Sequence, residues 1–206
     1  MSIGNVHMDV NEYSRLKQGY CLIAAKCIWE HFQLYSAFNN GEHSILGLGQ
    51  IHTRLLETII PDPFIIQYVS EGYIKSKNKS KEIYREHVVP CSFLLKEISF
   101  FFANSNALSD EEKITKAAKV IEDYIGIAIL TKKEAKLLDE HYKSTMPEKI
   151  DFTNPSSTFK LSRFTVNKTT QNIILRTLKW DAFIGNARGF NHNKAFRSKG
   201  HKFDWN

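Results

Sequence analysis

Hydrophobic residues in the first part of the chain recur at the three- and four-residue spacing of an α-helix. The spacing holds over residues 11–38, ends at the polar run Asn39-Asn40-Gly41, and returns within residues 42–60. Residues 64–74 form a shorter apolar segment that begins directly after a Pro-Asp-Pro sequence, and we interpret it as helix rather than strand. The pattern therefore predicts a mainly helical N-terminal region.

A different pattern begins at residue 83. The segment 83–89 is rich in β-branched and aromatic residues, and Pro90 cannot continue a central ladder, so the pattern predicts a strand that the proline ends. Helical spacing follows over residues 90–104 and again over residues 109–124. Residues 125–130 are a continuous apolar run, which is short enough for a buried strand.

Two helix starts carry the spacing of a capping box, in which a Ser or Thr precedes a Glu by three residues. Ser109 and Glu112 form the first of these pairs, and Thr131 and Glu134 form the second. The second pair directly follows the predicted buried strand and opens a helix that extends to Met146-Pro147. The order of elements is therefore strand, helices, strand, helix.

The remaining pattern is weaker. After the polar loop of residues 154–157, residues 159–166 alternate between apolar and polar and predict a strand. Residues 169–183 place apolar residues on one helical face and predict a helix. Taken together, the pattern predicts an α+β fold that is mainly helical.

Positive charge is concentrated near the C-terminus. The formal net charge is +6, and residues 154–206 hold ten Lys or Arg against two Asp or Glu. Aromatic residues such as Phe190 and Phe196 interleave with these basic residues, so the segment suits phosphates and unpaired bases. A solubilising tail, or an arm that packs its aromatic residues on the core, would explain the same composition.

Cysteine usage and hydropathy restrict the environment of the protein. Its three cysteines contain no C-x-x-C pair, which argues for a reducing compartment and against a disulfide framework or a cysteine-built zinc site. The sequence has no apolar run long enough to span a bilayer, and its N-terminus lacks the pattern of a signal peptide. We therefore expect a cytoplasmic protein without a membrane partner.

The candidate chemistry lies at the end of the first predicted strand, where Glu86 directly precedes His87. Adjacent strand residues point to opposite faces, so these two side chains can share a metal only where Pro90 makes the backbone turn. A hard divalent cation prefers carboxylate oxygen, and a neutral imidazole can take a proton from water. The pair suits a metal-assisted hydrolase, although a strand end with Glu86 paired to a lysine and His87 in a structural role would use the same residues.

The run Glu86-His87-Val88-Val89-Pro90, with Ser92, resembles the first signature of the HNH nuclease superfamily, which has the ββα-metal fold. The resemblance covers residues 80–150. It implies that His87 is the general base and that Glu86 binds a divalent cation, Mg²⁺ or Mn²⁺.

The family takes a further metal ligand from the helix after the second strand, and the helix that opens at Thr131 has the required position. Glu134 is the candidate there, although a capping box explains this residue equally well, and His141 is a poorer alternative. The helices between the two predicted strands are longer than the hairpin of the family. The predicted regions are an N-terminal helical region (1–79), a ββα-metal-like core (80–150) and a basic C-terminal segment (151–206).

The function that these expectations imply is a divalent-metal-dependent endonuclease acting on DNA, such as a restriction or phage or mobile-element enzyme. Arg85 would assist electrostatically, and the helices of residues 11–74 could form a homodimer. A non-catalytic nucleic-acid-binding protein and an interaction protein built on those helices are the alternatives. The residues expected to contact nucleic acid are Lys77, Lys79, Lys81, Arg188, Lys194, Arg197 and Lys199.

Overall fold

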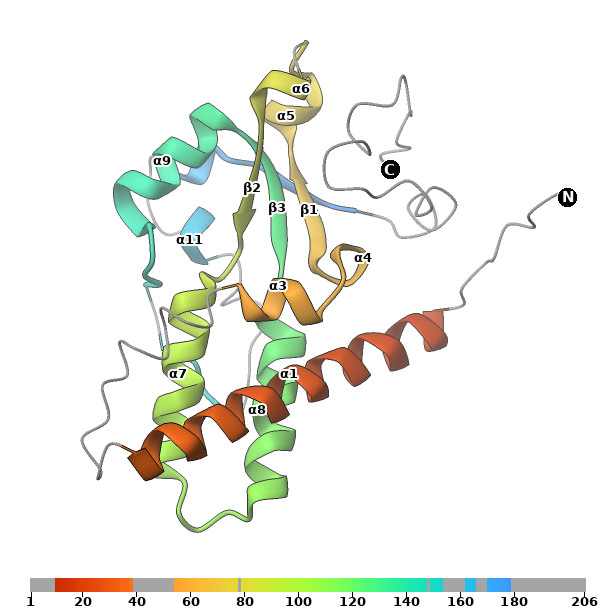
Figure 1. Cartoon of the computed structure of the whole chain (residues 1–206). Helices are drawn as coiled ribbons and strands as arrows, with labels where there is room; N and C mark the ends of the chain where they lie inside the picture. Colours follow the sequence, from red (N-terminus) through yellow and green to blue (C-terminus); the bar gives the residue numbers. More distant parts are fainter. Residues whose placement is uncertain are drawn as a thin grey trace, which may run out of the picture.

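The computed structural model describes residues 10–38, 54–77, 79–147, 149–153, 162–165 and 170–178 (Figure 1). Its strands are β1 (Ile66–Ser70), β2 (Ile83–His87), β3 (Ile127–Thr131) and β4 (Leu175–Thr177). Its helices are α1 (Val10–Phe38), α3 (Leu55–Ile59), α4 (Asp62–Ile65), α5 (Glu71–Lys75), α6 (Lys79–Glu82), α7 (Cys91–Asn104), α8 (Asp110–Tyr124), α9 (Lys132–Tyr142), α11 (Ser162–Thr165) and the 3-10 turn η1 (Thr170–Asn172).

The strands form one mixed sheet in the order β2-β3-β1-β4. β3 pairs antiparallel with β2 and parallel with β1, and β4 pairs antiparallel with β1. The sheet therefore takes strands from all three regions that the sequence pattern separates. Helices dominate the rest of the described chain, which confirms the prediction of a mainly helical α+β fold.

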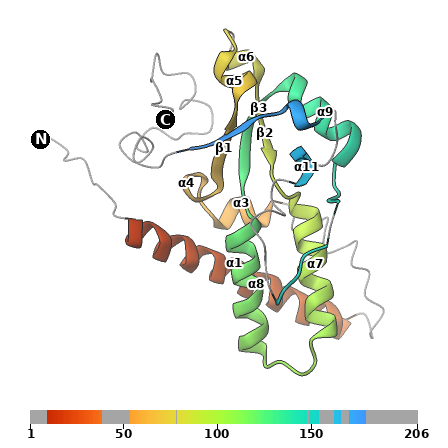
Figure 2. The ribbon, with the colours of Figure 1, turned by 180° about the vertical axis from the view of Figure 1, so that it is seen from behind.

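The two faces of the sheet are covered differently. Ile127 and Ile129 of β3 belong to a hydrophobic core shared with α1, α7 and α8, whereas Ala128 and Leu130 belong to a second cluster shared with α9 and α11. Because successive strand residues point to opposite faces, these two clusters mark the two sides of the sheet. Figure 1 shows α1, α7 and α8 beneath the end of the sheet where β2 finishes, and Figure 2 shows the same layout from behind.

Local hydrogen bonds explain the two best-predicted helix starts. At α8, the Ser109 backbone N–H donates to the Glu112 carboxylate at 2.8 Å, and the Glu112 N–H donates to the Ser109 hydroxyl at 3.3 Å. At α9, the Thr131 N–H donates to the Glu134 carboxylate at 2.8 Å, and the Glu134 N–H donates to the Thr131 hydroxyl at 3.2 Å. Both predicted capping boxes are therefore confirmed.

Several predicted elements are wrong where tertiary pairing decides the backbone. The sequence pattern predicts one helix over residues 64–74, but β1 occupies their middle and pairs with β3 and β4. Of the predicted strand 159–166, the described residues 162–165 form α11. Of the predicted helix 169–183, residues 170–178 form η1 and β4, and the rest lies outside the described residues.

Two further predictions concern the segments before β1 and β2. The helix expected within residues 42–60 is present as α3 over residues 55–59, and residues 42–53 lie outside the described part. The pattern predicts a loop for the lysine-rich run of residues 75–81, but the end of this run belongs to the short helix α6.

Candidate metal centre

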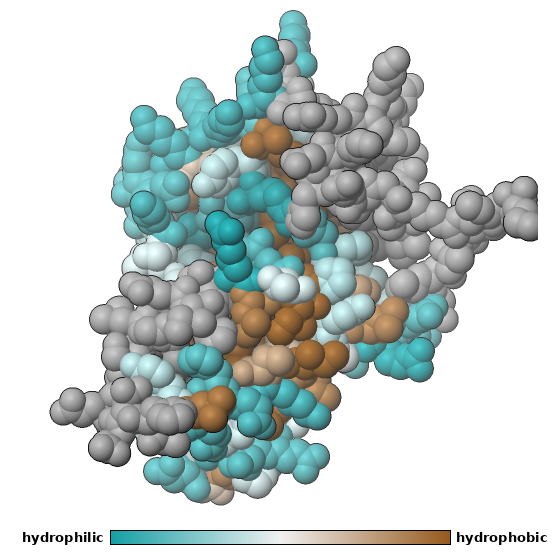
Figure 3. All heavy atoms as spheres, viewed as in Figure 1, coloured by the Kyte–Doolittle hydropathy of each residue, from teal (hydrophilic) through white to brown (hydrophobic). Residues whose placement is uncertain are grey.

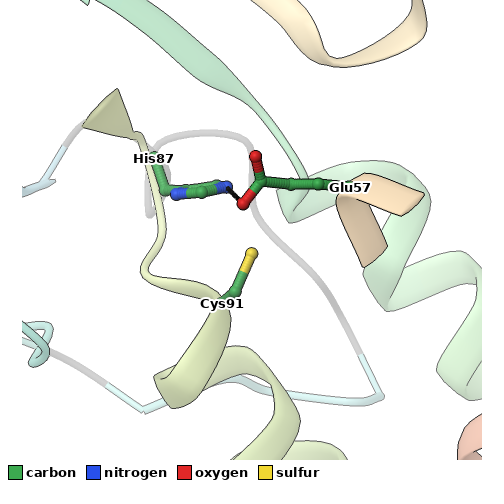
Figure 4. Close-up of side chains that lie close together, drawn as sticks. All are labelled: Glu57, His87 and Cys91. Atoms are coloured by element: carbon green, nitrogen blue, oxygen red, sulfur yellow. Dashed lines mark ion pairs between the residues drawn. The ribbon is translucent and has the colours of Figure 1, made fainter. Parts of the chain in front are cut away.

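Glu57, His87 and Cys91 converge at the end of β2 (Figure 4). One potential ligand atom from each residue lies within 4.8 Å of those of the other two. His87 is the last residue of β2, Cys91 is the first residue of α7, and Glu57 lies in α3. Three separate elements thus bring a carboxylate oxygen, an imidazole nitrogen and a thiol sulfur to one place.

The turn between β2 and α7 holds His87 and Cys91 together. The Val88 N–H donates to the Gly126 carbonyl at 2.8 Å and extends the β2–β3 ladder by one residue. The Leu94 N–H donates to the Pro90 carbonyl at 3.0 Å and starts α7. Val88 and its neighbour Val89 are fully buried, so packing anchors the turn on both sides.

His87 and Glu57 form a close polar contact, with 3.2 Å between Nε2 of His87 and Oε1 of Glu57. The contact has the distance of an ion pair but not the geometry of a hydrogen bond, so Nε2 has no hydrogen-bond partner among the described residues. The imidazole lowers the pKa of the Glu57 carboxyl, an effect that burial opposes and the charge of Arg85 reinforces. Glu57 is therefore a carboxylate at neutral pH.

The pKa of His87 reflects the groups around it. Burial by itself lowers this pKa, but the contacts with Cys91 and Glu57 more than reverse the effect and raise the pKa to about 10. Without a bound cation, the direction of this change favours the protonated imidazole at neutral pH. An imidazolium cannot accept a proton, so this state does not fit the general-base role that the sequence predicts for His87.

Glu86 lies on the opposite face of the sheet from His87. Its partner in β3 is Ala128, whereas that of His87 is Ile127. The Glu86 carboxylate accepts a hydrogen bond from Arg163 at 3.1 Å, and the same guanidinium donates to the His87 carbonyl at 2.6 Å. Burial raises the pKa of Glu86, and Arg163 offsets only part of this effect. Glu86 and His87 therefore do not share a site, because the ladder continues through both and no twist brings their side chains together.

Glu134 is held by its capping box and by a neighbouring strand. Its Oε2 accepts from the Thr131 N–H at 2.8 Å and from the Ser70 hydroxyl at 2.6 Å. Thr131 pairs with Ile83, so Glu134 lies at the end of β3 opposite to the one beside Glu86. The two positions, Ala128 and Thr131, are three residue steps apart, a distance of about 10 Å along β3. The structure therefore does not bring together the predicted metal ligands Glu86 and Glu134, and the residues around them do not fit Mg²⁺.

The remaining predicted residues lie apart from the cluster. Arg85 shares a face with His87, but its guanidinium is occupied by two hydrogen bonds to Asp62, of 2.8 and 2.5 Å. Lys77 and Lys81 precede β2 and lie at the end of the strand remote from His87. His141 is exposed on α9. The side chains of Lys79, Arg188, Lys194, Arg197 and Lys199 lie outside the described residues.

No protein family, curated protein or solved structure matches the chain. Within the described part of the chain, no helix combines the length and apolarity needed to cross a membrane.

The sequence pattern missed two members of the cluster. Cys91 lies four residues after His87 across a proline, and this spacing was the available signal. Glu57 lies 30 residues before His87 in an apolar run, and nothing local distinguishes it from a solvent-exposed helix residue. Only the packing of α3 against the end of β2 brings its carboxylate to the imidazole.

Proposed function

We propose that this protein is a divalent-metal-dependent endonuclease that hydrolyses phosphodiester bonds in DNA, with His87 at its centre. The observation that carries the proposal is the position of His87. The residue that the strand-end motif singles out lies within 4.8 Å of a carboxylate and a thiol, both of which are metal-ligating groups. The order of β2, antiparallel β3 and α9 also supports the proposal.

In this proposal Glu57 takes the role that the sequence assigned to Glu86. Its side chain is 35% exposed, against 22% for His87, so it is the more accessible of the two to water and substrate. Arg85 keeps its contact with Asp62 and helps to place the end of β2. A bound divalent cation supplies Lewis acidity by polarising a phosphoryl oxygen and activating water.

Exposed lysines at the far end of the sheet support a polyanionic substrate. Figure 3 shows hydrophilic residues over α5, α6 and α9, whereas hydrophobic residues gather around α3. Four residue steps along β2 separate this end from His87, or about 13 Å. At about 3.4 Å per base pair, a duplex touching both ends would span roughly four base pairs. The exposed lysines are Lys77, Lys81, Lys132, Lys133 and Lys136, together with Lys75, which pairs with Glu71.

The C-terminal segment contributes less free charge than its composition suggests. Arg163 pairs with Glu86, and Arg176 pairs with Glu71. Two of the ten basic residues of positions 154–206 are thus neutralised within the protein. The others remain candidates for phosphate contacts.

The test is incubation of supercoiled plasmid with the purified protein in the presence of Mg²⁺, Mn²⁺ or Zn²⁺, and with EDTA. We expect cation-dependent cutting that His87→Ala abolishes and that His141→Ala, an exposed control, retains. No cutting under any condition would contradict the proposal.

The lysine-rich end of the sheet also favours a second candidate, a non-catalytic nucleic-acid-binding protein. This candidate predicts salt-sensitive retardation of plasmid by wild type and His87→Ala alike, without cutting. Cutting that survives in His87→Ala would contradict both the endonuclease centred on His87 and the non-catalytic binding protein.

A further inference from the structure

We infer that Glu57, His87 and Cys91 form a binding site for a cation of the zinc class rather than for Mg²⁺. The donors are one oxygen, one nitrogen and one sulfur, supplied by α3, β2 and α7. Thiolate and imidazole are preferred ligands of Zn²⁺, whereas Mg²⁺ demands octahedral oxygen ligands. The chemistry of the donor set therefore points away from the cation that the sequence predicts.

The spacing of the donors suits this assignment. Zinc bonds of about 2.0–2.3 Å place neighbouring tetrahedral ligands roughly 3.3–3.8 Å apart. Nε2 of His87 and Oε1 of Glu57 are 3.2 Å apart, which is close to this separation. The three donor atoms lie within 4.8 Å of one another. A side-chain rotation that moves the Cys91 sulfur or the Glu57 oxygen by about 1 Å would bring all three donors to the separation of zinc ligands.

Two further observations indicate a missing ligand. Nε2 of His87 is buried, and its 3.2 Å contact with Oε1 of Glu57 lacks hydrogen-bond geometry, which suits two ligands that face a common cation. Cys91 occupies the first position of the 14-residue helix α7, whose start has no side-chain cap. This position aims the sulfur toward His87 and Glu57 rather than into the helix start (Figure 4).

The geometry disfavours a catalytic triad in which Cys91 is the nucleophile, His87 the base and Glu57 the orienting carboxylate. In a nucleophile–imidazole–carboxylate triad, the nucleophile and the carboxylate contact different nitrogens of the ring. Figure 4 instead shows the Cys91 sulfur pointing toward the gap between the imidazole and the Glu57 carboxylate. Cys91 is also only 5% exposed, which leaves its sulfur little access to a substrate.

Among the described residues the site has three protein ligands, and a tetrahedral site with three protein ligands keeps a fourth position for water or substrate, which is the pattern of catalytic rather than structural zinc sites. The biological use of the site rests on the proposed function, because a phosphodiester would approach the cation from the side of Glu57, whose side chain is 35% exposed. Binding of the cation does not rest on it and is measured without nucleic acid.

The first experiment titrates Co²⁺ into the full-length protein after removal of metals with EDTA, because Zn²⁺ itself has no useful absorption. We expect one cation per chain, a thiolate-to-cobalt charge-transfer band, and displacement by Zn²⁺ but not by excess Mg²⁺. Cys91→Ser should remove the band, and Cys27→Ser, whose residue is exposed on α1, should retain it. A band that survives in Cys91→Ser, or full displacement by Mg²⁺, would overturn the inference.

Glu57→Gln is the second variant, because it preserves the size of the side chain and leaves the thiol in place. We expect it to weaken Zn²⁺ binding by more than the roughly 10- to 100-fold typical of losing an outer-shell partner. Glu140→Gln, an exposed residue on α9, should bind Zn²⁺ as the wild type does. Equal affinities for Glu57→Gln and Glu140→Gln, with both proteins folded by circular dichroism, would overturn the inference.

The two proposals fail in different ways. Zinc binding without plasmid cutting would support the metal site and contradict the endonuclease proposal. Mg²⁺-dependent cutting by a protein that does not bind Co²⁺ or Zn²⁺ would support the endonuclease proposal and contradict the zinc site.

Discussion

At the scale of single residues, the cap of α9 depends on a glycine in the neighbouring helix α5. A Cβ atom at Gly72 would lie 2.4 Å from Oε1 and 2.8 Å from Cδ of Glu134. The carboxylate cannot move away freely, because its other oxygen accepts hydrogen bonds from Ser70 and Thr131. A side chain at position 72 would therefore displace the Glu134 carboxylate from the cap of α9, so the reason for glycine here is the close approach of Glu134 and not the backbone angle.

We expect Gly72→Ala to lower the free energy of unfolding by about 1–3 kcal/mol, as overpacking does elsewhere. Gly19→Ala is the matched control, since a Cβ there meets nothing within 4 Å and Gly19 lies inside α1. It should raise the free energy of unfolding by about 0.5–1 kcal/mol. Urea unfolding of both variants checks the prediction, and effects of the same sign would contradict it.

A second prediction at this scale distinguishes the roles of Glu57 and Glu86. If Glu57 is the carboxylate of the active centre, Glu57→Gln should lower the rate of plasmid cutting by at least about 100-fold. Glu86→Gln should lower the rate much less in the folded protein, because its carboxylate faces Arg163 on the other side of the sheet and acts on His87 only through the backbone. The reverse order of these effects would restore the assignment made from the sequence.

At the scale of elements, one arginine ties three segments together. Arg163 of α11 is fully buried and donates to the Glu86 side chain and the His87 carbonyl in β2, and to the Tyr142 carbonyl at the end of α9. Burial lowers the pKa of this guanidinium, and Glu86 opposes the effect. The ion pair fixes the second face of the sheet and the backbone of His87 at once.

Arg163→Met should destabilise the protein by about 3–5 kcal/mol, because it leaves the Glu86 charge buried without its partner. Arg176→Met offers a comparison, since the Arg176–Glu71 pair lies on the exposed edge strand and should matter little. Thermal unfolding measures both. A similar midpoint for the two variants would mean that Arg163 is dispensable to the packing of α9 and α11.

At the scale of the whole molecule, strands far apart in sequence build one sheet. β1 lies between β3 and β4, which are about 60 and 110 residues further along the chain. The core beneath the sheet joins α1 to α7 and α8, and it includes Leu178 directly after β4. α1 leaves Leu22, Ile23 and Leu34 exposed, and the homodimer stays a prediction.

The proposed binding of DNA by the C-terminal basic residues is tested at this scale. We expect the combined variant Arg188→Gln, Lys194→Gln and Arg197→Gln to bind duplex DNA more weakly. The slope of log affinity against log salt should flatten by about 0.9 for each phosphate that the variant no longer neutralises. A matched variant removes three exposed lysines elsewhere, with the same change of net charge: Lys26→Gln, Lys96→Gln and Lys149→Gln. Equal slopes for the two variants, measured by fluorescence anisotropy, would show that only net charge matters.

The parts of the fold that could be predicted are those decided within a few residues. Ser109 with Glu112 and Thr131 with Glu134 cap helices through hydrogen bonds between residues three apart, so the sequence is sufficient to find them. The strand before Pro90 follows from its own composition. Residues 66–70 form a strand only because β3 and β4 pair with them, and short apolar runs carry no local signal that separates strand from helix.

The sequence by itself determined that His87 stands at a strand end beside an acid and four residues before a cysteine. It also determined the mainly helical character of the chain and the excess of positive charge near its C-terminus. Only the tertiary structure decided which carboxylate meets the imidazole. The alternation of β2 sends Glu86 to Arg163, and the packing of α3 brings Glu57 to His87, because the neighbours of a strand residue are set by its face and by long-range contacts.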